Sequence, residues 1–115
     1  MSDAPLDLGT YTEGEIPPPL VVTFEDENGA ALDLSAFGTG RFEMQRFGGV
    51  AIERTASIST ATSGATKGQG TYVWVSGDMT VGTWTGEMWA INSTTNRFTS
   101  RKLRWFVQPA VKVPA

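Results

Sequence analysis

The side chains that most often perform chemistry in proteins are missing from this sequence. Its 115 residues include no histidine and no cysteine. Histidine is the commonest general base and metal ligand, and cysteine supplies thiol nucleophiles, thiolate metal sites and disulfides. We therefore predict a protein that is not an enzyme and that carries no cofactor or metal.

The densest acidic cluster is Glu25-Asp26-Glu27-Asn28-Gly29. Oxygen ligands of this kind suit calcium, but neighbouring strand residues point to opposite faces and the spacing of an EF-hand loop is absent. We interpret the cluster as the solvated end of a hairpin, with a calcium site as the alternative. Spacing does not exclude a glycosidase-type carboxylate pair, although nothing in the sequence selects one.

Two further segments resemble binding motifs only superficially. Residues 64–70 (GATKGQG) are rich in glycine but lack the Gly-Lys-Ser/Thr sequence and the following helix of a phosphate loop. We predict a flexible loop there. Arg97, Arg101, Lys102 and Arg104 lie close to Trp105 and could bind nucleic acid or an anionic sugar. The chain is acidic overall, with a net charge of −3, so a solvated edge or a subunit contact is the favoured interpretation and no nucleic acid partner is predicted.

Charge is distributed unevenly along the chain. Residues 1–36 carry eight acids and no base, whereas residues 97–115 carry five bases and no acid. One interpretation is that the first and last strands pair and neutralise each other within one sheet. The alternative is electrostatic complementarity between neighbouring copies or partners in an assembly.

The elements that must position these residues are predicted to be strands. Short β-branched and aromatic runs bounded by glycine, asparagine and proline recur, and helical spacing is hard to find. The predicted strands cover residues 20–26, 41–47, 50–58 (as two short pieces), 71–75, 83–91 and 102–107. Their spacing predicts an all-β, Ig-like antiparallel β-sandwich of about seven short strands at residues 20–115. Residues 1–19 are predicted to form an extended N-terminal arm, in which Pro17, Pro18 and Pro19 cannot donate ladder hydrogen bonds.

The last predicted strands carry apolar residues on both faces. Tyr72 and Trp74 alternate with Val73 and Val75, and comparable alternation recurs at residues 83–91 and 102–107. Because a sandwich strand packs on one core only, the second apolar set needs a cover. The predicted interface is this set together with the prolines and two basic residues of the arm and last strands: Pro17, Pro18, Pro19, Val73, Val75, Trp89, Ile91, Phe106, Arg101 and Arg104.

Trp89 is the centre of this prediction, because a tryptophan on a non-core face is a typical interface anchor. Two alternatives stay open for this side chain: the proline-rich arm or a loop of the same chain covers it, or it binds a ligand. A carbohydrate-binding module that uses Trp84, Trp89 or Trp105 as stacking platforms is the alternative function. The sequence contains no apolar run long enough for a membrane helix, so no membrane partner is predicted.

Several segments, read in order, resemble the N-terminal β-sandwich domain family of phage baseplate upper proteins and related tail and head accessory proteins. The segments are residues 13–20 (EGEIPPPL), 24–34 (FEDENGAALDL), 70–74 (GTYVW) and 78–88 (DMTVGTWTGEM). The resemblance implies a non-enzymatic virion structural protein of the tail or baseplate, neck or head decoration. Its implied partners are copies of itself and other virion structural proteins, and its implied location is the virion, assembled in the cytoplasm of a bacterial host.

Overall fold

The computed structural model describes residues 5–92 and 96–111, and this part of the chain is all-β with no helix. The all-β prediction is therefore confirmed. The eight strands are β1 (Leu6–Thr12), β2 (Leu20–Thr23), β3 (Thr39–Arg46), β4 (Ala51–Ile58), β5 (Gln69–Tyr72), β6 (Gly82–Ile91), β7 (Arg97–Thr99) and β8 (Leu103–Gln108).

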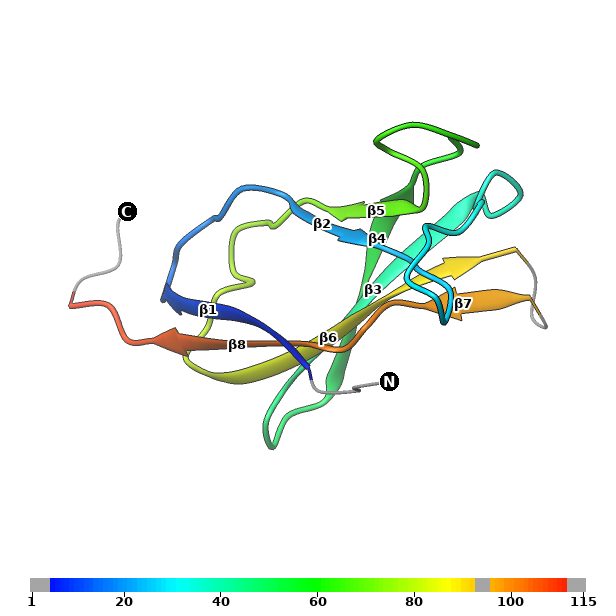
Figure 1. Cartoon of the computed structure of the whole chain (residues 1–115). Helices are drawn as coiled ribbons and strands as arrows, with labels where there is room; N and C mark the ends of the chain where they lie inside the picture. Colours follow the sequence, from blue (N-terminus) through cyan, green and yellow to red (C-terminus); the bar gives the residue numbers. More distant parts are fainter. Residues whose placement is uncertain (1–4, 93–95, 112–115) are drawn as a thin grey trace.

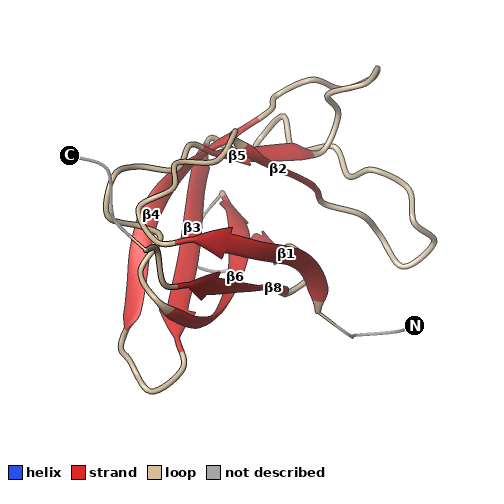
Figure 2. Cartoon of the chain, turned by 90° about the vertical axis from the view of Figure 1, so that its left-hand side faces the viewer, coloured by secondary structure: helices blue, strands red, loops and turns tan. Residues whose placement is uncertain are grey.

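The strands form one mixed sheet that curls into a half-barrel. Its order is β1-β8-β6-β3-β4-β5-β2, and β7 pairs with β6 beside β8 (Figure 1). Viewed from one end, β2 and β5 lie over β1, β6 and β8, while β3 and β4 close one side (Figure 2). The two edge strands β1 and β2 flank the open side.

The structure does not confirm the predicted Ig-like sandwich and corrects its antiparallel pairing. β1 runs parallel to β8, whereas every other strand pair in the described chain is antiparallel. The sheet stays continuous because β4 pairs with β3 through residues 51–56 and with β5 through Ser57 and Ile58. The sheet therefore bends within β4, and the strands on either side of the bend stay in one sheet.

Part of the predicted N-terminal arm is a strand of this sheet. Asp7 aligns with Arg104 and Thr10 with Phe106, so β1 holds one extra residue, which is a β-bulge. Gly9 adopts a φ of 97° at the bulge, and its N–H donates to Asp7 Oδ1 at 2.8 Å. The bulge shifts the alternation, which places Leu8 and Tyr11 against the core. Residues 13–19 connect β1 to β2, and residues 1–4 lie outside the described part.

The inner face of the sheet forms a single core rich in aromatic rings. Trp84 stacks on Trp105 with centroids 6.0 Å apart, Trp105 on Phe42 at 6.1 Å, and Phe42 on Tyr72 at 4.7 Å. Trp74 meets Phe42, Tyr72 and Trp105 edge-on. The predicted alternation at residues 71–75 is confirmed, because Tyr72 and Trp74 are buried and Val73 and Val75 are exposed.

Candidate functional site

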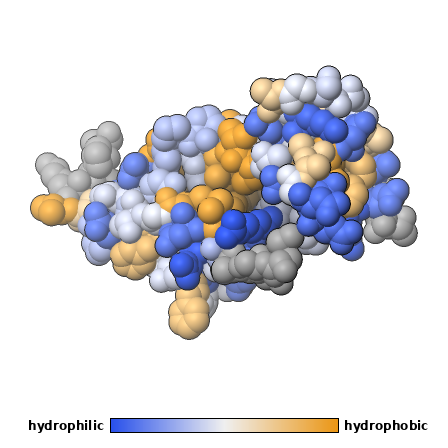
Figure 3. Space-filling view, viewed as in Figure 1, coloured by the Kyte–Doolittle hydropathy of each residue, from blue (hydrophilic) through white to orange (hydrophobic). Residues whose placement is uncertain are grey.

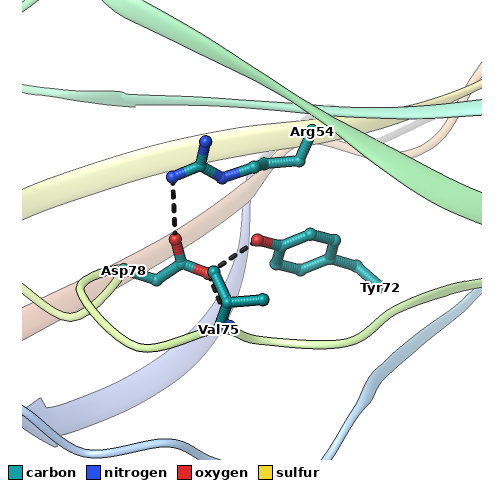
Figure 4. A network of polar contacts seen from close by, with 4 residues as sticks. All are labelled: Arg54, Tyr72, Val75 and Asp78. Atoms are coloured by element: carbon teal, nitrogen blue, oxygen red, sulfur yellow. Dashed lines mark hydrogen bonds and ion pairs between the residues drawn. The ribbon is translucent and has the colours of Figure 1, made fainter.

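The most buried charge in the described chain belongs to a polar network at one end of the core (Figure 4). The Asp78 side chain is fully buried, and its Oδ2 accepts hydrogen bonds from the Tyr72 hydroxyl at 2.6 Å and the Val75 N–H at 2.9 Å. Its Oδ1 accepts from Arg54 Nη2 at 3.1 Å. Arg54 reaches this point because it lies on the inner face of β4, where Phe42 of β3 is its cross-strand partner.

The network acts as a structural tie. Burial, followed by the bond to Asp78, raises the pKa of Tyr72 to about 12, so its hydroxyl stays a hydrogen-bond donor at neutral pH. The bond to Asp78 also raises the pKa of Arg54. Because Arg54 and the protonated Tyr72 both bond the Asp78 carboxylate, they hold β4, β5 and the turn before β6 together. The four residues of this network include no histidine, serine or cysteine nucleophile.

Trp89 lies on the outer face of β6, as predicted, and it is half-buried. Its cross-strand neighbours are Arg41 of β3 and Thr99 of β7. The guanidinium carbon of Arg97 sits 5.6 Å from the centre of the ring, within cation–π range. The side chain that lies over this tryptophan therefore comes from strand β7 of the same chain, whereas the prediction named the proline-rich arm or a loop.

The predicted interface residues do not form one patch. Phe106 pairs with Thr83, six residues from Trp89 along β6, which places the two aromatics about 20 Å apart on the same outer face. Ile91 is half-buried beside Arg97. Val73 and Val75 follow β5 on another side of the half-barrel, where they are 62% and 46% exposed. Pro17 is buried, whereas Pro18 and Pro19 are exposed before β2.

An apolar cluster that the sequence pattern did not reveal lies at the other end of the outer face. Phe47 is 90% exposed at the tip of the β3–β4 hairpin, and its N–H donates to the Thr83 carbonyl at 2.8 Å. Phe47, Thr83 and Phe106 thus form one row across β3, β6 and β8. Val50 and Val81 are also exposed, by 83% and 36%, in the adjoining turns. Phe47 and Val50 flank the Gly48-Gly49 turn. Apolar residues on both sides of a hairpin turn are the sequence signal from which their exposure could have been predicted.

Trp84 and Trp105 are 3% and 1% exposed, so both belong to the core and neither presents a stacking platform for a sugar. Of the three tryptophans named for carbohydrate binding, Trp89 alone reaches the surface. Arg97 lies over the Trp89 ring, on which a sugar would have to stack.

The opposite charges at the two ends of the chain meet inside the sheet. Asp7 of β1 and Arg104 of β8 are register partners, and their side chains lie 3.4 Å apart. The first and last observed strands therefore pair, although the predicted first strand, residues 20–26, lies at β2 and pairs with β5 instead. Arg101 is exposed in the short crossing between β7 and β8.

Three glutamates form a row across the outer face. Glu43 of β3 faces Glu53 of β4 on one side and Glu87 of β6 on the other. Arg41 lies 3.6 Å from Glu43 and 3.7 Å from Glu53, and this compensates part of the like-charge repulsion. Within residues 5–92 and 96–111, no group of three or more acidic side chains is arranged to hold a metal ion.

An apolar groove runs along the open side of the half-barrel, between β1 and β2 (Figure 3). It encloses about 250 Å³. Its apolar walls come from both edge strands and the start of β8, namely Leu6, Leu8, Leu20, Val21, Val22 and Leu103. Thr23, Glu25, Ser100 and Arg101 complete its polar part.

Comparison with known proteins adds no relative: no protein-family model matches the chain, and no curated protein matches it. Over the described residues, no helix is long and apolar enough to cross a membrane.

Proposed function

We propose that this chain is a non-enzymatic structural protein of a bacteriophage virion that binds neighbouring subunits in a symmetric assembly. Its place would be the tail or baseplate, the neck, or the head surface. Its partners would be copies of itself and other virion structural proteins.

The observation that carries the proposal is the exposed aromatic pair Phe47 and Phe106, which the backbone of Thr83 joins into one row, with Val50 and Val81 exposed in the adjoining turns. Exposed apolar side chains are costly to leave in water, and apolar patches mark protein interfaces. Aromatic anchors of this kind dominate the binding energy of many interfaces. The half-barrel also has two edge strands, which are templates for pairing with another chain.

The phage assignment rests on the sequence resemblance. The segments that carry it fall on the β1–β2 connection, on the turn after β2, on β5 and on the start of β6. The curled sheet places β2 and β5 opposite β6 and β8 across one core, and we propose that this two-layer arrangement corresponds to the sandwich of that family. The ordered turn at Asn28-Gly29, where Gly29 has a φ of 83°, supports the alignment of the second segment.

Mass spectrometry and immunogold labelling of purified phage particles test the virion assignment. The expected result is a fixed copy number per particle and labelling at one location. Absence of the protein from intact particles would refute it.

Light scattering of the purified protein tests the interface. We expect the Phe47→Ser, Phe106→Ser double variant to stay folded and to self-associate more weakly than the wild type, because Phe47 is 90% and Phe106 44% exposed. Thr62→Ala is the control, since it lies in the exposed loop at the opposite end of β4. A double variant that assembles like the wild type would exclude this row as the contact.

A further inference from the structure

The free edge of β2 exposes backbone groups that are ready to pair with another strand. Phe24 N–H donates to the Gly68 carbonyl at 2.7 Å, in continuation of the β2–β5 ladder. Alternate residues of a strand bond to the same neighbour, so Leu20 and Val22 bond to β5. Val21 and Thr23 therefore turn their N–H and C=O groups away from β5, toward the groove.

The opposite wall of the groove is less open. β1 is interrupted by its bulge, where the Gly9 N–H is taken by Asp7 Oδ1. At the end of the strand, the Thr12 N–H donates to Glu15 Oε1 at 2.9 Å. These local bonds occupy donors that a new strand would need, so β2 is the edge that offers regular pairing.

The groove sets the side-chain pattern of whatever binds there. Its 250 Å³ lies below the range of about 300–1,000 Å³ typical of sites for drug-sized ligands, and its walls are mainly leucine and valine. A strand beside β2 would direct alternate side chains into this space and the intervening ones outward. Small aliphatic residues at every second position fit this requirement.

The outward face near β2 is acidic. Glu25 and Glu27 are exposed just beyond the strand, and neither takes part in an ion pair within the described chain. An incoming strand with a basic residue between its two apolar ones would place the opposite charge on this side.

The segment after β8 has this pattern: it reads Val111-Lys112-Val113 and is bounded by Pro109 and Pro114. Val111 is fully exposed in the described structure. We infer that the β2 edge binds Val111-Lys112-Val113 of a second copy, with the two valines in the groove and Lys112 facing the acidic end of β2. This contact rests on the proposed self-association and names one way in which it arises.

A synthetic peptide of residues 108–115 (QPAVKVPA) tests the contact directly. Titrated into the isotope-labelled full chain, it is expected to bind saturably and to shift the amide resonances of Val21 and Thr23. A peptide with glutamate in place of Lys112 is expected to bind about tenfold more weakly, because it faces Glu25 and Glu27 with a like charge.

Two substitutions at one exposed position separate charge from folding. Val21→Lys is expected to weaken peptide binding more than Val21→Glu, because both variants lose the same apolar wall contact at this half-exposed site and only the lysine repels Lys112. Thr23→Pro removes an N–H that faces the groove and leaves the bonds to β5 in place, so it is expected to abolish binding in a protein that stays folded. Circular dichroism checks folding.

The outcomes distinguish this contact from the proposed function. A wild-type chain that self-associates but ignores the peptide overturns the β2 contact and leaves the proposed function standing. Equal binding of a scrambled peptide (AVPKPVQA) shows that the edge does not select this sequence and overturns the assignment to Val111-Lys112-Val113 of a second copy. A chain that is monomeric at every concentration, ignores the peptide and is missing from particles overturns both.

Discussion

The hydroxyl of Tyr72 donates a 2.6 Å hydrogen bond to the carboxylate of Asp78, and this contact ties the end of β5 to the turn that precedes β6. Arg54 reaches the same carboxylate from β4, and the Val75 N–H closes the turn around it. A single buried side chain therefore holds three segments of the half-barrel in position.

Asp78→Ala is expected to lower the free energy of unfolding by about 3 kcal/mol, because it leaves the Tyr72 hydroxyl and the Val75 N–H without their acceptor. Tyr72→Phe, which removes one bond and keeps the ring, should cost about 1–2 kcal/mol. Urea denaturation measures both. Equal stability of Asp78→Ala and the wild type would show that the network does not hold the fold.

Stability is expected to fall between about pH 10 and pH 12, because the folded pKa of Tyr72 is raised from 10.0 to about 12. In that window the unfolded chain loses the phenolic proton while the folded chain keeps it, so rising pH favours unfolding. Below pH 10 the contribution is complete. Tyr11, the other tyrosine, has a pKa raised by burial and by Glu15, so it adds to the same loss.

Denaturation curves across this pH range, compared between the wild type and Tyr72→Phe, isolate the contribution of Tyr72. The variant should show a shallower fall. Identical slopes in the two proteins would contradict the assignment.

Gly40→Ala is expected to destabilise the protein by roughly 3 kcal/mol, because a Cβ at this position would lie 2.4 Å from the Ala56 carbonyl oxygen. That oxygen belongs to the backbone of β4 and cannot rotate away. Gly38→Ala is the matched control, since a Cβ there meets nothing within 4 Å. Thermal unfolding of the two variants should separate them clearly, and similar melting temperatures would argue against the close β3–β4 approach.

The Asp7–Arg104 pair is expected to contribute less than about 1 kcal/mol, because both side chains are more than half exposed. A double-mutant cycle with Asp7→Asn and Arg104→Gln measures the coupling, which should shrink further in high salt. A large, salt-independent coupling would mean that the pair is shielded from water, as it would be in an interface.

Much of the strand content could be read from local patterns. Residues 41–47 and 83–91 were predicted nearly to the residue, since each is a run rich in aromatic and apolar residues bounded by glycine or asparagine. β1 was missed because its bulge at Gly9 breaks the alternation, and the neighbouring glycine and acidic residues are typical of an extended arm. β7 has only three residues, all exposed, which leaves no periodicity to detect.

The candidate surface was predicted only in part. Alternation placed Trp89 and Phe106 on the outer face correctly, because side chains of a strand point to opposite sides in turn. It carried no information on the Arg97 side chain that lies over Trp89, or on the backbone hydrogen bond that places Phe47 beside Thr83. Arg54 was equally hidden, since its partner Asp78 lies 24 residues away.

The sequence by itself determined that the chain is all-β, which residues of 71–75 face inward, and that histidine and cysteine chemistry is absent, because these follow from residue types and from the two-residue period of a strand. The tertiary structure decided which strands are neighbours: the parallel β1–β8 pair, the bend through β4 and the open groove beside β2. Pairing between strands far apart in the sequence depends on how the whole core packs, and local pattern does not encode it.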